Sequence, residues 1–263
     1  MSRPLIIGHR GSCAVYPENT EISFIKGLEQ GAEMFEFDVR LTKDGFPVVM
    51  HDNKLSRIAG RPGYASQRTW KFLSQLDVGS WKGKKFAETR LSLLGDIFKL
   101  VSPHVPLNLE MKFNRGTAAE QSRPLVEKVV SIIKELKLTR RVLVSSFCHE
   151  ALPVMNELEP EIMTARLYEA NAGPLGKKEL EYLKTQPLRR RIKEGDLPFK
   201  GRMMCLHHSL ATEKFVKEVR KLGGGILCWT VDDPDDMRRL ASYGVAGIIS
   251  NKPDLLKKVL NDL

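Results

Sequence analysis

The 263-residue sequence contains no long apolar run and no leader-like segment. A membrane-spanning helix needs about 18 or more consecutive apolar residues, and no window of this chain provides them. The N-terminal stretch MSRPLIIGHRG has an apolar run of only three residues, too short for the hydrophobic region of a secretory signal. We therefore expect a cytoplasmic protein without a transmembrane segment.

Cysteine is scarce, and its four positions are scattered: Cys13, Cys148, Cys205 and Cys228. No two of them have the CxxC spacing of a zinc site or a redox pair, so reduced thiols in or near the core are expected. The sequence also lacks a Gly-x-Gly-x-x-Gly fingerprint and a phosphate-binding P-loop after any expected strand. Their absence counts against an open nucleotide-binding sheet.

Positive charge is in excess, with 42 Lys and Arg against 32 Asp and Glu and a formal net charge of +10. Such a charge suits an anionic partner: a phosphoester, a nucleic acid or an acidic membrane surface. Nucleic-acid binding would predict aromatic residues interleaved with a basic stripe, and the sequence shows no such stripe. In the connection 169–202, the run 189–191 (Arg-Arg-Arg) is either a solvated helix end or a basic lid that attracts anionic substrate or a peripheral membrane contact. The sequence predicts no oligomeric state.

Strand-like apolar runs alternate with amphipathic helices along most of the chain. This alternation predicts an α/β fold with a parallel sheet. Eight strands predict a closed (β/α)8 TIM barrel, with an open doubly wound sheet as the alternative. The strands are expected at 5–8, 33–39, 106–112, 141–147, 162–168, 203–207, 225–231 and 245–250. The helix after the first strand is expected to be capped by Asn19 or Thr20.

Residues 53–90 break the alternation. Glycine and proline interrupt this stretch, and aromatic residues punctuate it. We expect a single domain over 1–263 with an inserted subdomain at about 53–90, after the second strand region. Such an insert is expected to lie over the active face and to shape what enters.

The stretch 36–52, EFDVRLTKDGFPVVMHD, is predicted to form half of a site. Glu36 and Asp38 are two residues apart, so both carboxylates leave the same face of an extended strand. The Asp-Gly pair within 42–45 predicts a tight turn between two apolar runs. The returning arm then brings His51 and Asp52 back beside the two carboxylates.

Other polar residues fall where a barrel places its active residues, at the carboxyl ends of the strands. His9 and Arg10 end the first strand, and Trp229 ends the seventh. In the strand 106–112, period two places Glu110 and Lys112 on one face. This arrangement repeats that of Glu36 and Asp38 on a neighbouring strand.

The three carboxylates of Glu36, Asp38 and Glu110 are expected to repel one another and to raise each other's pKa values unless a cation binds. Oxygen-only ligands favour Mg²⁺ or Ca²⁺ over Zn²⁺. Arg10 and Lys112 at the same rim supply the charge that a phosphoryl group needs. His9 and His51 suit general acid and base roles, so the set points to phosphodiester cleavage. Which histidine is the acid stays open.

The order of these motifs resembles the glycerophosphodiester phosphodiesterase family over nearly the whole chain. The matching stretches are His9-Arg10-Gly11, 17–20 (Pro-Glu-Asn-Thr), 36–39, 42–45, His51-Asp52, 110–112, 145–147, 229–231 and 247–254. The resemblance implies a TIM barrel with an insertion after His51-Asp52. It also implies a metal on Glu36, Asp38 and Glu110, His9 and His51 as the acid/base pair, Arg10 and Lys112 on phosphate oxygens, and Trp229 as a wall of the pocket.

The resemblance further implies a metal-dependent hydrolase that cleaves small phosphodiesters such as glycerophosphocholine and glycerophosphoethanolamine to sn-glycerol 3-phosphate and an alcohol. In the family mechanism, a glycerol hydroxyl attacks phosphorus and gives a cyclic phosphate that water opens. A lysophospholipase D or sphingomyelinase D-like activity is an alternative, which a wide apolar entrance formed by the insert would favour. A nucleic-acid phosphodiesterase and a catalytically inactive ligand-binding barrel are less favoured.

Overall fold

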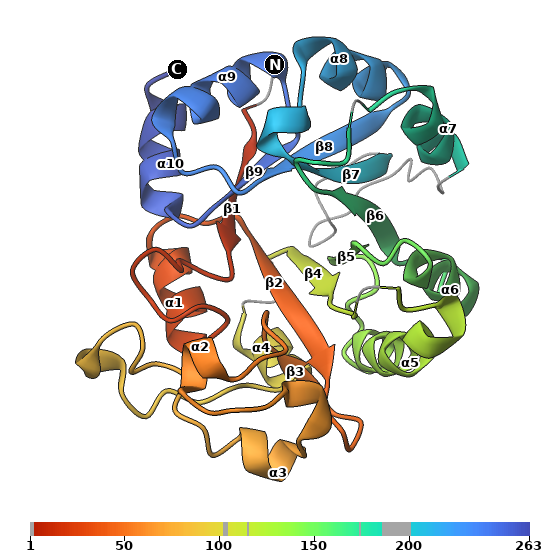
Figure 1. Ribbon diagram of the computed structural model, residues 1–263. Helices are drawn as coiled ribbons and strands as arrows, with labels where there is room; N and C mark the ends of the chain where they lie inside the picture. The colour runs from red at the N-terminus through yellow and green to blue at the C-terminus, as the bar shows by residue number, and fades with distance from the viewer. Residues whose placement is uncertain (1–2, 102–104, 115, 174, 186–200) are drawn as a thin grey trace.

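Eight parallel strands form a closed barrel in the computed structural model, which describes residues 3–101, 105–114, 116–173, 175–185 and 201–263 (Figure 1). Around the barrel the strands follow one another in sequence order, and β1 pairs with both β2 and β9 to close it. The prediction of a (β/α)8 barrel is therefore confirmed, and the open sheet is wrong. The barrel strands are β1 (Leu5–His9), β2 (Met34–Leu41), β4 (Leu107–Met111), β5 (Val142–Ser146), β6 (Met163–Tyr168), β7 (Arg202–His207), β8 (Gly224–Trp229) and β9 (Gly247–Ser250).

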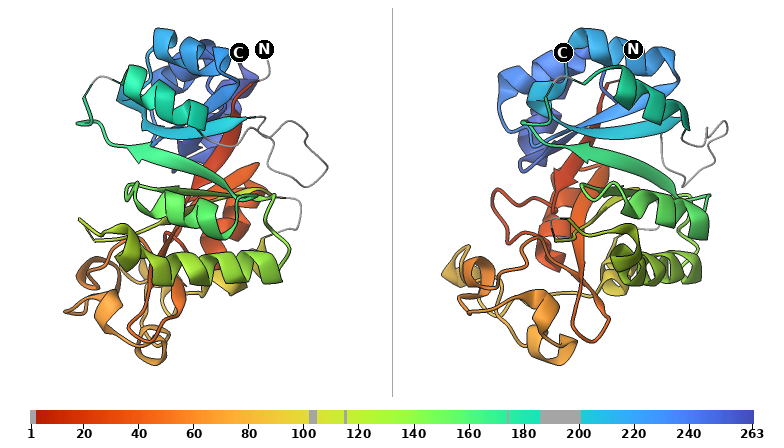
Figure 2. Two further views of the ribbon diagram at one scale, coloured as in Figure 1. Left: turned by 90° about the vertical axis from the view of Figure 1, so that its right-hand side faces the viewer. Right: turned by 45° about the vertical axis from the view of Figure 1, so that its right-hand side comes forward.

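Helices connect the strands and surround the barrel (Figure 2). Each presents an apolar face to the strands; in α1, for example, Phe24 is fully buried. The connecting helices are α1 (Glu21–Glu29), α4 (Leu94–Leu100), α5 (Ala119–Glu135), α6 (Ala151–Leu158), α7 (Lys177–Thr185), α8 (Glu213–Lys221), α9 (Pro234–Tyr243) and α10 (Pro253–Asn261). In the described residues, no helix is long and apolar enough to cross a membrane.

The alternation along β2 divides its side chains between two environments. Phe35 and Phe37 point outward and meet Phe24 of α1 edge-on, with ring centroids 5.3 and 5.8 Å apart. Glu36 and Asp38 point to the inside of the barrel. Below them the lumen is filled by apolar side chains that form a separate cluster: Ile7, Met34, Leu143, Ala165, Leu167, Met203, Cys205, Leu227 and Ile249. The barrel is thus a packed core that carries polar groups only at its carboxyl end.

The predicted hairpin brings the chain back beside β2. Strand β3 (Pro47–Val49) pairs antiparallel with β2, so that Val49 lies opposite Val39. The turn needs Gly45, whose φ of 82° lies in the left-handed region that a glycine adopts without strain.

Residues 53–90, called the insert below, contain short helices and no strand between β3 and α4. The helices are α2 (Ser56–Ala59), α3 (Trp70–Leu73) and 3-10 turns at Ala65–Gln67 and Lys84–Phe86. The insert shares a small apolar cluster with β3, formed by Val48, Met50, Leu55, Ile58, Ala65, Leu73, Leu76, Val78 and Leu91. Figure 1 shows it in orange, at the opposite end of the molecule from both termini.

Three local expectations concerned the cap of α1, the cysteines and the run 189–191. Thr20 does occupy the cap position of α1, but its hydroxyl donates to the Pro17 carbonyl, so the side chain caps no helical N–H. The four cysteines are free thiols, as predicted. Residues 189–191, expected to form either a solvated helix end or a basic lid, lie outside the described residues.

Candidate active site

The predicted site residues come together at the carboxyl ends of the strands. A pocket of about 920 Å³ is lined by His9, Arg10, Glu36, His51, Glu110, Lys112 and Trp229, among others. Asp38 is fully buried behind this lining and contacts it through Arg10 and Lys112. Residues of β1, β2, β4 and β8, far apart in the sequence, thus share one cavity.

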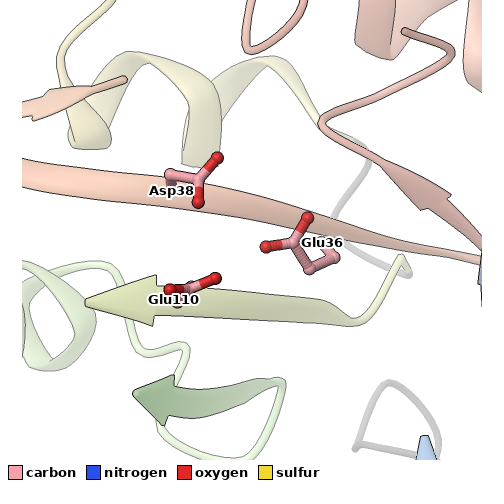
Figure 3. A group of neighbouring side chains, drawn as sticks. All are labelled: Glu36, Asp38 and Glu110. Atoms are coloured by element: carbon pink, nitrogen blue, oxygen red, sulfur yellow. The ribbon is translucent and has the colours of Figure 1, made fainter. Parts of the chain in front are cut away.

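Glu36, Asp38 and Glu110 point toward one another from two neighbouring strands (Figure 3). The register pairs Asp38 of β2 directly with Glu110 of β4, and one carboxylate oxygen from each of the three lies within 4.8 Å of the others. All three side chains are buried; Glu110 Oε1 and Asp38 Oδ1 lie against Lys112 Nζ, and Glu36 Oε2 accepts no hydrogen bond. Three buried carboxylates, one of them with an oxygen that has no hydrogen-bond partner, fit a hard divalent cation, because uncompensated buried charge is costly.

Arg10 and Lys112 form ion pairs with Asp38 and Glu110, and Asp38 is the carboxylate that contacts both of them. Lys112 Nζ lies 2.5 Å from Glu110 Oε1 and 3.2 Å from Asp38 Oδ1, and Arg10 Nε lies 3.1 Å from Asp38 Oδ2. Burial raises the pKa of Glu110 to about 7 and raises that of Glu36 well above its ordinary value. Burial acts on Asp38 in the same sense, but Lys112 and Arg10 outweigh it and lower its pKa. The expectation of mutually raised pKa values is therefore wrong for Asp38.

His9 is held by hydrogen-bonded side chains of the residue that follows β9 and of the loop after β8. Its Nδ1 lies 2.6 Å from Asn251 Oδ1, and Asn251 Nδ2 donates to Asp232 Oδ2 at 2.5 Å. Because a carboxylate only accepts, the Asn251 amide nitrogen must face Asp232 and its oxygen must face His9. His9 Nδ1 therefore carries the proton, and Nε2, 3.6 Å from Glu36 Oε2, keeps its lone pair. Burial and the neighbouring Arg10 lower the pKa of His9 to about 4, so the ring is neutral at pH 7.

His51 has a carboxylate partner instead of an amide. Its Nδ1 lies 2.7 Å from Asp52 Oδ1, which leaves Nε2 free to face the pocket. Burial opposes the ionisation of Asp52, but hydrogen bonds from Arg57 and His51 outweigh it and lower the Asp52 pKa to about 2. Burial lowers the pKa of His51, against the attraction of Asp38. The partner of His51 is a charged carboxylate and that of His9 a neutral amide; both hydrogen bonds raise the pKa of their ring, and a full negative charge stabilises an imidazolium more than an amide does.

Arg57 of the insert links the partner of His51, Asp52, to the partner of Arg10, Glu18. Its Nε donates to Asp52 Oδ2 at 2.6 Å, and its two terminal nitrogens donate to the Glu18 carboxylate, each at 2.7 Å. Glu18 also accepts from Arg10 at 2.9 Å. No residue of the insert lines the pocket as described. The insert therefore contacts the site through this ion-pair network and not as part of the pocket wall.

Sequence reasoning did not single out several of these residues. Asn19, expected as a helix cap, instead donates from Nδ2 to Asp38 Oδ2 at 2.8 Å, and Asn251 and Asp232 orient His9. The only sequence signal was that Glu18, Asn19 and Asn251 belong to the motifs 17–20 and 247–254. Trp229, which was predicted, lines the pocket with its ring edge-on to Phe147 at 5.5 Å.

Comparison with known proteins agrees with this geometry. Residues 9–255 match the model of the Glycerophosphoryl diester phosphodiesterase family. A glycerophosphodiester phosphodiesterase of Caldanaerobacter subterraneus is 31% identical, over 97% of this chain and 96% of its own. A lysophospholipase D of Rattus norvegicus is 23% identical, over 98% of this chain and 86% of its own.

A solved structure of an Oleispira antarctica phosphodiesterase, in complex with the product sn-glycerol-3-phosphate, has a TM-score of 0.82 and 27% identity. The match covers 98% of this chain and 97% of that one. The barrel, the pocket and the family match over nearly the whole length lead to one conclusion: the chain belongs to the glycerophosphoryl diester phosphodiesterase family.

Proposed function

We propose that this protein hydrolyses glycerophosphodiesters, such as glycerophosphocholine and glycerophosphoethanolamine, to sn-glycerol 3-phosphate and an alcohol. The observation that carries the proposal is one pocket in which two histidines, Arg10 and Lys112 surround a buried trio of carboxylates. The sn-glycerol-3-phosphate complex of the Oleispira antarctica phosphodiesterase supports the choice of product. We also propose a single domain whose residues 53–90 form an inserted subdomain.

Glu36, Asp38 and Glu110 would hold a divalent cation, Mg²⁺ or Ca²⁺. When bound, the cation neutralises the charge of these carboxylates and of the phosphodiester oxygens. Arg10 and Lys112 would bind the remaining phosphate oxygens. Burial opposes their charge, but Asp38 outweighs it and raises the pKa of both side chains, so they stay cationic.

His9 would act as the general base. Its Nε2 lone pair accepts the proton of a glycerol hydroxyl while that oxygen attacks phosphorus. His51 would act as the general acid, since Asp52 favours a proton on this ring. Its Nε2 gives the proton to the departing alcohol oxygen as the phosphorus–oxygen bond breaks, leaving a cyclic phosphate. Water opens this ring with the proton transfers reversed, and Trp229 with Phe147 would wall the pocket around the substrate.

A lysophospholipase D activity is the second candidate, favoured by the relative from Rattus norvegicus. It calls for an apolar entrance that accommodates an acyl chain. No residue of the insert lines the described pocket, so an apolar entrance formed by the insert, which would favour this activity, is not part of it. We therefore propose the smaller, deacylated glycerophosphodiesters as the substrates.

The test is a substrate panel with the purified chain, Mg²⁺ or Ca²⁺, and coupled detection of glycerol 3-phosphate. The panel consists of glycerophosphocholine, glycerophosphoethanolamine, lysophosphatidylcholine and a nucleotide diester. We expect release from the first two, lost on exhaustive chelation and in His51→Ala and Glu110→Ala. Full activity after chelation, or unchanged rates in both variants, would overturn the proposal. Faster turnover of lysophosphatidylcholine would select the second candidate.

A further inference from the structure

The positive charge of the chain is concentrated in the insert. Its 38 residues contain nine Lys or Arg and two acids, a formal charge of +7, whereas the whole chain has +10. The nine cations are Lys54, Arg57, Arg61, Arg68, Lys71, Lys82, Lys84, Lys85 and Arg90. The catalytic proposal uses none of them directly, and Arg57 alone takes part in the network around Asp52.

Most of these cations have no anionic partner. Arg57 pairs with Glu18 and Asp52, but no residue within the described ranges forms an ion pair with any of the other eight. All of them except Lys82 are exposed. The two acids of the insert offer little compensation, since Asp77 is occupied by its own turn, where it accepts from the backbone of Gly79 and Ser80. An exposed set of unpaired cations on one small unit fits an anionic surface.

Aromatic side chains are exposed on the same unit. Tyr64, Phe72 and Trp81 of the insert, and Phe46 in the adjoining turn, are each between 38% and 43% exposed. The turn is attached to the insert, because Lys43 N donates to the Arg68 carbonyl. Half of the exposed large apolar side chains of the described chain therefore lie in this basic region. Aromatic rings beside cations are the composition of surfaces that enter the headgroup layer of a bilayer.

The positions of the cations favour a membrane over a single-stranded nucleic acid as the anionic partner of the insert. Arg57 and Lys82 lie over the Trp81 ring at 5.2 and 5.4 Å, and Arg68 lies over the Phe72 ring at 5.1 Å. These cations already occupy positions that a stacked base would need. A ring covered by a cation still presents its edge, which enters the acyl boundary while the cation stays among the headgroups.

We propose that the insert docks the protein onto the surface of an anionic phospholipid bilayer. The exposed rings enter the interface, and the unpaired cations contact lipid phosphates. The insert reaches the active site through Arg57, so docking places that site next to the membrane.

The proposal is tested by co-sedimentation of the full chain with vesicles of phosphatidylcholine alone or with about 30% phosphatidylglycerol, at about 0.1 M salt. The test variant is Lys71→Gln/Lys84→Gln/Lys85→Gln. The matched control, Lys128→Gln/Lys214→Gln/Lys221→Gln, removes the same charge from exposed positions of α5 and α8. We expect binding to the anionic vesicles only, with a loss of roughly 100-fold in the test variant, since each cation at such a surface contributes about a factor of five.

Equal losses in the two variants, or no binding to anionic vesicles, would overturn the proposal. Tighter binding of a single-stranded RNA than of the vesicles would do the same. A blue shift of tryptophan emission on anionic vesicles, absent in Trp81→Phe, is expected from interfacial insertion. The lysine variants should hydrolyse soluble glycerophosphocholine at the wild-type rate. This separates a failure of docking from a failure of the proposed chemistry.

Discussion

Replacing Asn251 with leucine tests how the protein sets the tautomer of His9. The substitution keeps the branched shape of the side chain at Cγ but removes the oxygen that lies 2.6 Å from His9 Nδ1. Asp232 keeps two of its three donors, the Ser250 hydroxyl and the residue 251 N–H, so the loop should remain folded. The change therefore acts mainly on the orientation of the imidazole and on the nitrogen that carries its proton.

The expected fall in kcat follows from what the hydrogen bond between His9 and Asn251 contributes to catalysis. A general base contributes about 10²- to 10⁴-fold to a rate, and a buried hydrogen bond of this kind is worth roughly 1 kcal/mol in position alone. Without its acceptor, the His9 ring populates both tautomers and several orientations. We expect kcat for glycerophosphocholine to fall by about 10- to 100-fold, with KM changed by less than about threefold because the phosphate contacts remain.

The assay combines steady-state kinetics with ¹H–¹⁵N correlation spectra of the histidine rings. In the wild type His9 should be protonated at Nδ1, and in Asn251→Leu the Nε2-protonated form should appear. Cys13→Ala is the matched control. The Cys13 thiol donates to the same Asn251 oxygen at 2.7 Å, and its removal leaves that oxygen in place as the acceptor for His9. Wild-type kcat in Asn251→Leu, or an equal loss in Cys13→Ala, would refute the reasoning.

Three further predictions concern stability, pH and the metal. Phe24→Ala should lower the free energy of unfolding in urea by about 3–5 kcal/mol, because the side chain is fully buried between rings of β2, while the exposed neighbour Ile25→Ala should cost less than about 0.5 kcal/mol. The low pKa of Asp52, about 2, contributes stability that is present above its ordinary pKa of about 3.9 and is lost as the pH falls toward 2. Arg57→Met should weaken that acid dependence in pH-dependent melting, and an unchanged slope would show that the network carries no such linkage. Glu110→Gln should weaken the binding of Mg²⁺ or Ca²⁺ in isothermal titration by at least tenfold, and undiminished affinity would remove Glu110 from the metal site.

Local pattern was sufficient for the elements and for most of the site. The period of two in β2 and β4 assigned Glu36, Asp38 and Glu110 to the inner face without knowledge of the partner strands, since alternation is a property of an extended chain. The Asp-Gly turn within 42–45 likewise predicted the return of His51. The strand ranges agreed closely with the structure because apolar periodicity and glycine or proline punctuation are encoded locally.

Contacts between distant segments could not be predicted from local sequence pattern. Asn251 meets His9 across 242 residues, and Arg57 meets Glu18 across 39. No local pattern specifies such pairs, because they depend on the closure of β1 against β9 and on the path of the insert. The sequence also could not show which carboxylate the cations favour. The pKa of Asp38 is lowered because Arg10 and Lys112 both converge on it, and that convergence depends on the folded geometry.

The sequence by itself determined the barrel, the residues that face its carboxyl end and the family resemblance, since all three rest on periodicity and on the order of motifs. The tertiary structure decided which nitrogen of His9 holds the proton, why Asp52 stays ionised, and that the insert contacts the site through Arg57 without lining the pocket. Those properties depend on burial and on distances between charges, and both exist only once the chain is folded.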